Sequence, residues 1–485
     1  MRKFLAILLA AIMLVTVLAA CGPSETAPPA GGQTDAPPAD TGTADPAPPP
    51  AVDDTPRAGG TINVWSFTDE IPNAFLRFRE MNPDFPYDIN VTVIATDGGG
   101  YQQALDQALI AGGSDAPDIY TAEAAFVLKY SQVDAAHLAM PFSELLGEPV
   151  EPKIAAAQLA PYTVELGTRT SDGAVVALPF QMTGSGYIYR RSLATQIWGT
   201  DDPEEVGAKI GPGYDKFLAA ASEAAAEGIA ILAGEGDAWQ AIRNGASTPW
   251  VVNDRLQLDS IRESYLDVGF ALYNNDYTTK VDAWSDGWFA GFGGNSEKPI
   301  LGYMGPAWLI SYVMSGNAGD TFGDWAITHA PVPFTWGGTW VFANGNSDES
   351  KRAGIATLVE WMTLDTSNTA LQQYFADGNL FEGSAAFPDQ AADYAEGRIF
   401  KDAVNSGVIL GRSNGTLDFL GGQNMYDIFI PAGATASGRG FGPYDETINQ
   451  AFSDQAVQYF MGEKSRDQAI EDFKQFVADT LDIPS

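Results

Sequence analysis

Residues 61–123 alternate between short strand-like and longer helix-like stretches, and this alternation constrains the fold more than any other feature of the sequence. In 61–67 and 89–95 apolar and polar residues alternate, which is the period of a strand. Stretches of helical periodicity follow at 71–81 and 101–111, and residues 117–120 lead into a third strand. Strands that alternate with helices predict a parallel sheet with right-handed crossovers.

The loops after these three strands are polar and acidic. They read FTDE, ATD and YTAE in the sequence. In parallel sheets the carboxyl ends of the strands gather at one edge, and ligands bind there. The sequence therefore predicts a polar ligand site at this edge.

Charge and composition exclude several classes of protein. The chain has 485 residues, which predicts two or three domains, since a domain takes ~100 to 200 residues. Its 26 basic against 62 acidic residues give a formal charge of -36, which repels nucleic acid. A 45% share of hydrophobic residues excludes global disorder.

The sequence also offers little for metal or nucleophilic chemistry. Cys21 is the one cysteine, so no intrachain disulfide can form. His137 and His329 are far apart in sequence, and each is expected to be structural or exposed. No HExxH, GxxxxGK(S/T), GxSxG or EF-hand spacing occurs, so we expect neither a cofactor nor a bound metal.

The first 58 residues are expected to address and tether the protein. Arg2 and Lys3 precede an apolar run that ends in LAACG, which predicts a signal peptide over 1–20 and lipidation of Cys21. The alternative is a signal-anchor helix, but the run is shorter than the ~20 residues of a typical span. Residues 22–58 contain ten prolines, which predicts a disordered tether over 21–58, either a mobile leash or a passive spacer.

The rest of the chain adds further strands, helices and a group of tryptophans. Residues 174–189 pair two apolar strands around a glycine-containing stretch, as a crossing between lobes would. Helical patterns are found at 214–227, 261–273, 348–364 and 466–481. Tryptophan and glycine are dense from residue 284 onwards; the tryptophans are Trp284, Trp288, Trp308, Trp325, Trp336 and Trp340.

Several segments, in this order, carry a resemblance to a known family. After the lipobox and tether come INVWSFTDE, PDIYTAEAAF, VVALPFQMTGSGYIY, ILGYMGPAWLISYV and THAPVPFTWGGTWVFA. This order resembles the extracellular solute-binding proteins of carbohydrate ABC importers, of which the maltose-binding protein is the familiar member. The resemblance covers residues 59–485 and rests on motif order.

The resemblance implies a two-lobed α/β fold of the type II periplasmic-binding-protein kind, with hinge crossovers between the lobes. The first lobe is expected over 59–178 and 341–410, and the second over 179–340 and 411–485. Hinge strands are expected near 177–185, near 340–343 and after Phe381. The implied activity is capture of a sugar by hinge closure, without catalysis.

The resemblance also implies ligand-binding residues in the first lobe and at its border. A sugar presents an apolar face and a belt of hydroxyls, so its site needs aromatic rings and fixed polar groups. Asp69, Glu70 and Glu123 follow strands, although residues 68–70 are equally placed to cap a helix. Trp65 is either core or ligand-binding, and Gln181 and Thr183 are expected to face the ligand at the crossover.

In the second lobe the resemblance points mainly to aromatic residues. Trp308 would open a helix beside the ligand, and Trp336 with Gly337 and Gly338 resembles a loop where the backbone approaches the ligand. Three further candidates each have a structural alternative. Trp239 and Trp284 are ligand contacts or core residues, and Asn424 and Asp427 are ligand contacts or part of a surface loop.

The expected partners follow from this assignment. They are a small carbohydrate, the transmembrane subunits of an ABC permease, and the membrane through the lipid anchor only; nucleic acid is not expected, and the chain is expected to be a monomer on the extracytoplasmic side. A lipid-anchored glycoside hydrolase, a glycan-binding adhesin or sensor, and a binder of a non-sugar solute remain as alternatives.

Overall fold

The computed structural model describes residues 57–96, 99–133 and 135–484. The predicted signal peptide, Cys21 and the tether up to residue 56 lie outside these residues. Arg57, predicted to belong to the tether, is already part of the fold. Its backbone N–H donates to Asp88 Oδ2 at 3.0 Å, and its guanidinium group donates to the carbonyl oxygen of Phe85 at 2.9 Å.

The first sheet has five strands in the order β2-β1-β3-β10-β4. Strand β1 (Thr61–Ser66) is parallel to β2 (Asp88–Val93) and to β3 (Ile119–Glu123), as the alternating pattern predicts. Strand β10 (Thr339–Ala343) is antiparallel to β3 and to β4 (Ala177–Pro179). The sheet is therefore built from segments far apart in the sequence.

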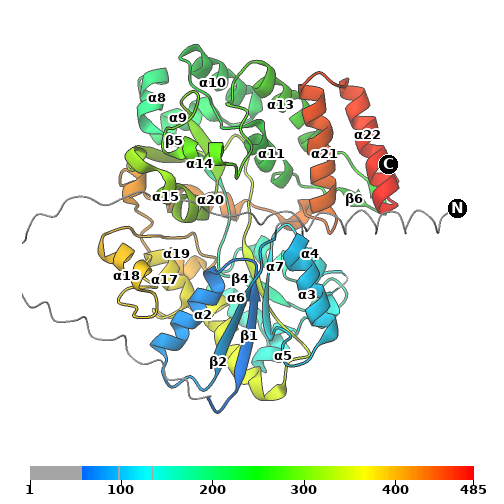
Figure 1. The fold of residues 1–485 in the computed structure, drawn as a ribbon, viewed down its shortest axis with the longest axis vertical. Coiled ribbons are helices and arrows are strands. Elements are labelled where there is room, and N and C mark those ends of the chain that lie inside the picture. The colour runs from blue at the N-terminus through cyan, green and yellow to red at the C-terminus, as the bar shows by residue number, and fades with distance from the viewer. Residues whose placement is uncertain (1–56, 97–98, 134, 485) are drawn as a thin grey trace, which may run out of the picture. The chain divides into compact units, whose positions relative to one another are not determined.

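Helices surround the first sheet, and together they form what we call the first lobe (Figure 1). They are α2 (Glu70–Met81), α3 (Gly100–Ala111), α4 (Val127–Ser131), α5 (Phe142–Leu146), α6 (Glu151–Ala157), α7 (Pro161–Leu166), α16 (Arg352–Thr363), α17 (Leu371–Asp377), α18 (Pro388–Ala395) and α19 (Gly407–Leu410), with the short turns η2 (Ala136–Leu138) and η5 (Glu349–Lys351). The helix predicted over 348–364 begins as the turn η5, which Asp348 caps by accepting from the Ser350 N–H at 2.8 Å, and continues directly as α16.

The second sheet has three antiparallel strands in the order β8-β5-β9. They are β8 (Gly302–Gly305), β5 (Gly186–Arg190) and β9 (Trp325–His329), and a separate hairpin pairs β6 (Val251–Val252) with β7 (Arg255–Leu256). We call this sheet and its helices the second lobe.

The second lobe has mostly helical secondary structure. Its helices are α8 (Arg191–Trp198), α9 (Pro203–Ile210), α10 (Tyr214–Ala226), α11 (Glu235–Asn244), α12 (Ser260–Glu263), α13 (Tyr265–Asn274), α14 (Asp286–Phe292), α15 (Ser315–Asn317), α20 (Tyr426–Ala434), α21 (Asp445–Phe460) and α22 (Arg466–Leu481), with the π-helix η3 (Leu309–Met314) and the turns η4 (Gly319–Thr321), η6 (Asp418–Leu420) and η7 (Gly438–Gly440). The helix predicted over 261–273 is two helices, α12 and α13, that meet at Ser264.

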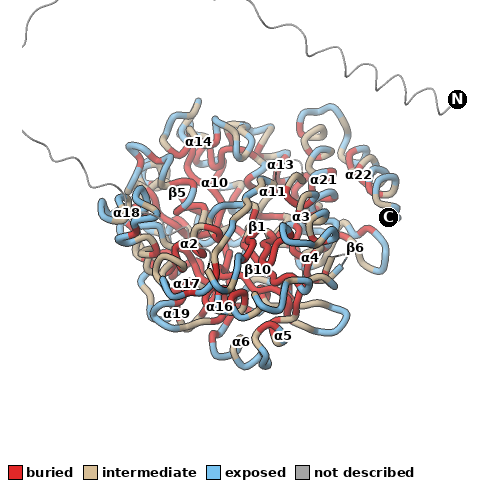
Figure 2. The backbone as a smooth tube through the Cα atoms, turned by 60° about the horizontal axis from the view of Figure 1, so that its bottom comes forward, coloured by how far each residue is buried: buried red, intermediate tan, exposed pale blue. Residues whose placement is uncertain are grey.

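Two packed cores support these sheets. One includes the buried strands β1 and β10, which Figure 2 shows among the buried segments while the surrounding turns are exposed. The other lies among α10, α11, α13, α21 and α22, with Trp239, Trp250, Phe452 and Phe473 in it. No helix in the described part of the chain is long and apolar enough to cross a membrane.

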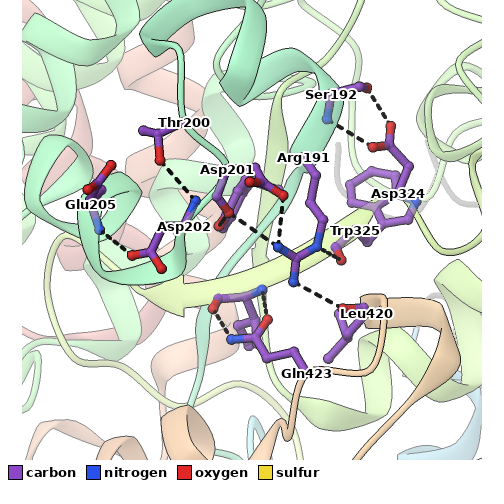
Figure 3. A network of polar contacts seen from close by, with 12 residues as sticks. Arg191, Ser192, Thr200, Asp201, Asp202, Glu205, Asp324, Trp325, Leu420 and Gln423 are labelled. Carbon is purple, nitrogen blue, oxygen red and sulfur yellow. Dashed lines mark hydrogen bonds and ion pairs between the residues drawn. The ribbon is translucent and has the colours of Figure 1, made fainter.

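The chain returns to the second lobe near residue 420, and side chains fix it against β9 (Figure 3). Gln423 pairs with the backbone of Ile327 through both amide atoms, at 2.8 and 2.7 Å, as a neighbouring strand would. Arg191 donates to the carbonyl oxygens of Trp325 and Leu420, both at 3.1 Å. An otherwise open sheet edge is thereby covered.

Two connecting segments run between the sheets and pair with each other. The first, 180–185, joins β4 to β5, and the second, 330–338, joins β9 to β10. The Ser185 N–H donates to the carbonyl oxygen of Phe334 at 3.0 Å, and the Trp336 N–H donates to that of Thr183 at 3.2 Å. Segment 402–406 lies on the other side of the first connection, where Met182 N–H donates to the carbonyl oxygen of Ala403 at 2.7 Å.

Candidate ligand-binding site

Three tryptophans form a cluster beside the connecting segments, and we call Trp284, Trp308 and Trp336 the tryptophan cluster. The rings of Trp284 and Trp308 are stacked, with centroids 6.2 Å apart and planes 9° apart. Trp336 meets Trp308 edge-on at 5.0 Å and Trp284 at 6.1 Å. Trp284 is 51% exposed, and the other two are half-buried. The cluster thus keeps aromatic surface in contact with solvent.

Local structure holds each ring of the cluster in place. Trp308 follows β8 and a Gly-Pro turn and precedes the π-helix η3, a helix type that is frequent at functional sites. Its indole N–H donates to the carbonyl oxygen of Trp336 at 2.9 Å. Trp284 has a φ of +68°, a strained conformation for a bulky residue, and lies just before Ser285, which caps α14.

Gly337 and Gly338 let the second connecting segment approach the cluster closely. Their φ angles are +74° and +111°, where L side chains are strained. A Cβ on Gly337 would lie 3.2 Å from the Trp308 indole nitrogen, and one on Gly338 would lie 3.0 Å from the Trp340 ring. Thr183 adds a hydrogen bond of 3.1 Å from its hydroxyl to the Gly337 carbonyl oxygen. The two glycines are required by this geometry.

A carboxyl group of the first lobe meets the second lobe at η3. Glu70, the first residue of α2, accepts a hydrogen bond from the Tyr312 hydroxyl, and its Oε1 has no partner among the described residues. Loss of water around the carboxyl raises the pKa of Glu70 to about 7. The pKa of the Tyr312 hydroxyl is also raised, while the ring is 47% exposed. The Tyr312 ring is therefore open to a ligand beside the cluster.

Asp402 is a second carboxyl group in this region. It is 1% exposed and accepts hydrogen bonds from Gln181 Nε2 at 2.8 Å and from the Ala403 N–H at 2.7 Å. Burial raises the pKa of Asp402, and the negative charge of Glu70 raises it further. Gln181 bonds to Asp402, and Thr183, two residues later on the same connecting segment, bonds to Gly337 beside the cluster. This segment therefore links Asp402 to the tryptophan cluster.

Glu123 lies at the end of β3 and also faces the second lobe. Its Oε2 accepts from the Ala125 N–H at 2.9 Å. Burial raises the pKa of Glu123 to about 7, although the positive charge of Arg243 on α11 opposes this. Burial in turn lowers the pKa of Arg243. Glu123 and Arg243 therefore place opposite charges on the facing sides of the two lobes.

The structure places the remaining predicted residues as follows. Trp65 is half-buried against the first core, and Asp69 is exposed and makes no side-chain capping bond to α2. Trp239 is 4% exposed and packs against Tyr265 and Phe452 in the second core. Asn424, just before α20, donates to Oδ1 of Asp427 in the first turn of α20 at 3.3 Å.

The sequence did not predict three residues near the candidate site, namely Tyr312, Asp402 and Arg243. Tyr312 lies four residues after Trp308, and this helical spacing was a usable signal. Nothing local in the sequence singles out Asp402 or Arg243. Within the described residues no group of three or more His, Cys, Asp or Glu side chains is arranged to hold a metal ion.

Comparison with solved structures gives the fold. An extracellular solute-binding protein of family 1 superposes with a TM-score of 0.65 at 19% identity, over 86% of this chain and 98% of its own. The galacto-N-biose-/lacto-N-biose I-binding protein of an ABC transporter from Bifidobacterium longum, in complex with lacto-N-biose, gives 0.63 at 16% identity, over 87% and 97%. The sugar-binding protein MalE from Xanthomonas citri gives 0.59 at 15% identity, over 87% and 97%.

These similarities confirm the predicted α/β fold of the two-lobed, type II solute-binding kind. All three proteins are named as binding proteins. No protein-family model and no curated sequence matches the chain.

Proposed function

We propose that this protein is the substrate-binding component of an ABC importer and that it captures a carbohydrate between its two lobes. The observation that carries the proposal is the tryptophan cluster beside the connecting segments, with Glu70 and Tyr312 next to it. Exposed rings suit the apolar face of a sugar, and the carboxyl and hydroxyl groups suit its hydroxyl belt. The fold supports the same role, since the similar proteins include binders of lacto-N-biose and of other sugars.

Each group has a role in the proposed binding. The rings of Trp284, Trp308 and Trp336 stack on sugar faces, and the backbone at Gly337 and Gly338 approaches the ligand. Glu70 accepts hydrogen bonds from sugar hydroxyls through its unpartnered Oε1, and Asp69 and Glu123 are further acceptors near the ends of the neighbouring strands β1 and β3. Gln181 and Thr183 hold the connecting segment, while Trp65, Asn424 and Asp427 remain secondary candidates. Trp239 is left out, because it is buried in the second core.

Hinge closure couples ligand binding to transport in this proposal. The first lobe comprises 59–178 and 341–410, the second comprises 179–340 and 411–485, and the connecting segments bend between them. A sugar held by both lobes lowers the free energy of the closed state relative to the open state. The Glu70–Tyr312 hydrogen bond adds a direct contact between the lobes, and Glu123 and Arg243 add an electrostatic attraction.

The N-terminal sequence gives the protein its proposed location. A signal peptide over 1–20 exports the chain, a diacylglycerol on Cys21 anchors it, and the proline-rich tether lets a monomer reach the permease on the extracytoplasmic side. A polybasic or transmembrane attachment is not needed for this arrangement.

A binding screen tests the proposal. The full chain, kept in a detergent without a sugar head group, is heated with single mono- and oligosaccharides while its melting temperature and the sugar products are followed. The proposal predicts a saturable rise in melting temperature for at least one sugar, with the sugar recovered intact. Cleaved sugar would establish a glycoside hydrolase instead, and the absence of any shift would make the ligand a non-sugar solute.

A further inference from the structure

A pocket, which we call the outer pocket, adjoins the end of η3 that is farther from Trp308. It has a volume of about 380 Å³, within the range of small-molecule sites. Aromatic and polar side chains line it together. The lining residues include Gly316, Phe322, Phe400, Lys401, Asp418 and Phe419.

The η3 helix connects the outer pocket to the tryptophan cluster. Trp308 lies at its start, Tyr312 in its middle, and Gly316 just after its end. Residues spaced by four lie close to one face of a helix, and eight residues span at most roughly 12 Å, because the α-helical rise is ~1.5 Å and a π-helix rises less per residue. The hydroxyl of Ser311 donates to the carbonyl oxygen of Lys401, so η3 also contacts the pocket wall.

Both lobes contribute walls to the outer pocket. Residues 397–401 belong to the first lobe: they follow α18, and the next residue, Asp402, donates its backbone N–H to the carbonyl oxygen of Phe375 on α17 at 3.1 Å. The opposite wall belongs to the second lobe, where the Phe419 ring stacks on Trp325 at 5.9 Å and meets Phe322 at 5.6 Å. A ligand in this pocket contacts both lobes.

The chemistry of the outer pocket suits an uncharged polar ligand. Phe322 and Phe400 are 45% and 36% exposed, so aromatic faces are open. The charged residues that line the pocket sum to zero formal charge. Arg398 forms an ion pair with Asp393. Lys401 donates to the Asn414 carbonyl oxygen, and Asp418 supplies the second negative charge. A neutral sugar offers the apolar face and the hydroxyls that such a surface binds.

We propose that the outer pocket is a second subsite, which takes the far end of an oligosaccharide whose inner residues lie on the tryptophan cluster. This inference rests on the proposed function. Trp308 and Gly316 lie eight residues apart along this helical segment, farther than one monosaccharide reaches, so the ligand has two or more sugar units. Affinity therefore rises with chain length once the oligosaccharide reaches the pocket.

Gly316 allows a test that fills the pocket without disturbing the fold. A Cβ on Gly316 would meet nothing within 4 Å, and its φ is outside the left-handed region, so Gly316→Leu is tolerated. Gly236→Leu on α11 is the matched control, because its Cβ also meets nothing within 4 Å. Phe400→Ala removes a ring from the pocket instead of adding bulk.

The full chain and these variants are titrated by calorimetry with α-1,4- and β-1,4-linked glucose oligosaccharides of two to six units. We expect the wild-type Kd for one series to fall at least tenfold between the disaccharide and the longer sugars. Gly316→Leu and Phe400→Ala lose most of this gain and keep the disaccharide Kd, whereas Gly236→Leu behaves as wild type.

Two other outcomes are distinguishable. A wild-type Kd that does not change with chain length, or a gain retained in Gly316→Leu, overturns the outer subsite and leaves the sugar-binding function intact. If no sugar of either series binds, the result contradicts the proposed binding of these sugars and also the outer subsite.

Discussion

The second lobe uses tryptophan in two different ways, and comparing them shows what distinguishes a binding surface from a core. Trp250 is fully buried, donates to Asn449 Oδ1 at 2.8 Å, and packs against Phe452 and Phe473. In the tryptophan cluster, by contrast, Trp284 is 51% exposed and Trp308 contacts it mainly as a stacked neighbour.

The difference lies in how the ring faces are covered. Arg262 lies over the Trp250 ring at 4.5 Å, and core aromatic rings pack around it, so no face is left for a ligand. In the cluster, the Trp308 indole N–H is satisfied by the Trp336 carbonyl oxygen, and the rings keep apolar surface exposed. Exposed apolar surface of this kind is costly unless a ligand covers it. The core tryptophans should therefore control stability, and the cluster tryptophans should control binding.

The largest expected effect is on the core side of this comparison. Trp250→Ala removes a fully buried ring and leaves the Asn449 carboxamide without its donor, so we expect the free energy of unfolding to fall by about 3 to 5 kcal/mol. Urea unfolding of the full chain measures this. The folded fraction of Trp250→Ala should bind sugar with unchanged affinity. A large loss of affinity without a loss of stability would contradict the assignment of Trp250 to the core.

Trp308→Ala should show the reverse pattern. It removes a stacked ring and the donor to the Trp336 carbonyl oxygen, so we expect sugar affinity to fall about 100-fold, or ~2.7 kcal/mol. We expect unfolding free energy to change by only about 1 kcal/mol, since the ring is half-buried. Calorimetric titration beside urea unfolding separates the two effects, and equal losses in both would make Trp308 a core residue.

Gly338→Ala should lower the stability of the fold by less than Trp250→Ala does, and the affinity for sugar by less than Trp308→Ala does. The added Cβ would lie 3.0 Å from the Trp340 ring at a φ of +111°, so we expect a loss of about 1 to 3 kcal/mol in stability and a weaker affinity. Gly236→Ala, where a Cβ meets nothing within 4 Å, is the control. Unchanged melting temperature and affinity in Gly338→Ala would show that the second connecting segment can relax.

The last prediction concerns the pH dependence of stability. The pKa of Glu70 is raised from 4.5 to about 7 in the folded chain, so folding favours its protonated form. Its contribution to stability is fully present below pH 4.5 and is lost as the pH rises through about 7. Glu70→Gln should therefore flatten the decline of stability across this window, by at most about 1.4 kcal/mol per pH unit.

Asp172→Asn is the control for the pH experiment. The Arg169 guanidinium lowers the pKa of Asp172 to about 2, so its titration lies below the window. Urea unfolding of ligand-free protein from pH 4.5 to 8 measures the slopes. If the unfolding free energy of Glu70→Gln depended on pH as steeply as that of the wild type, burial would not raise the pKa of Glu70 as stated.

Local periodicity explains which parts of the fold were predictable from the sequence. Strands β1 and β2 alternate apolar and polar residues, and α2 and α3 carry helical stripes, so these elements lie within a residue or two of the prediction. The division of residues 260–274 into α12 and α13 was not predictable from the stripe. Asp259 caps α12 and Arg262 reaches the carbonyl oxygen of Gly440, a contact that exists only in the folded chain.

The candidate site was predictable where a special backbone was needed. The Gly337–Gly338 pair marks a left-handed turn, and Trp336 beside it follows from the same motif. Asp402 was not predictable, because it approaches Glu70 only when distant parts of the chain fold together in the first lobe. Trp239 and Trp308 look alike in sequence, and only the packing of α11 against α13 and α21 buries one of them.

The most direct test of the account is a tryptophan fluorescence titration of the full chain with a sugar that raises its melting temperature. Wild-type protein and Trp336→Ala are compared at equal concentration. The account predicts a saturable fluorescence change in the wild type and an affinity about 30-fold weaker, or ~2 kcal/mol, in Trp336→Ala. The same affinity in both proteins would contradict capture of sugar by the tryptophan cluster.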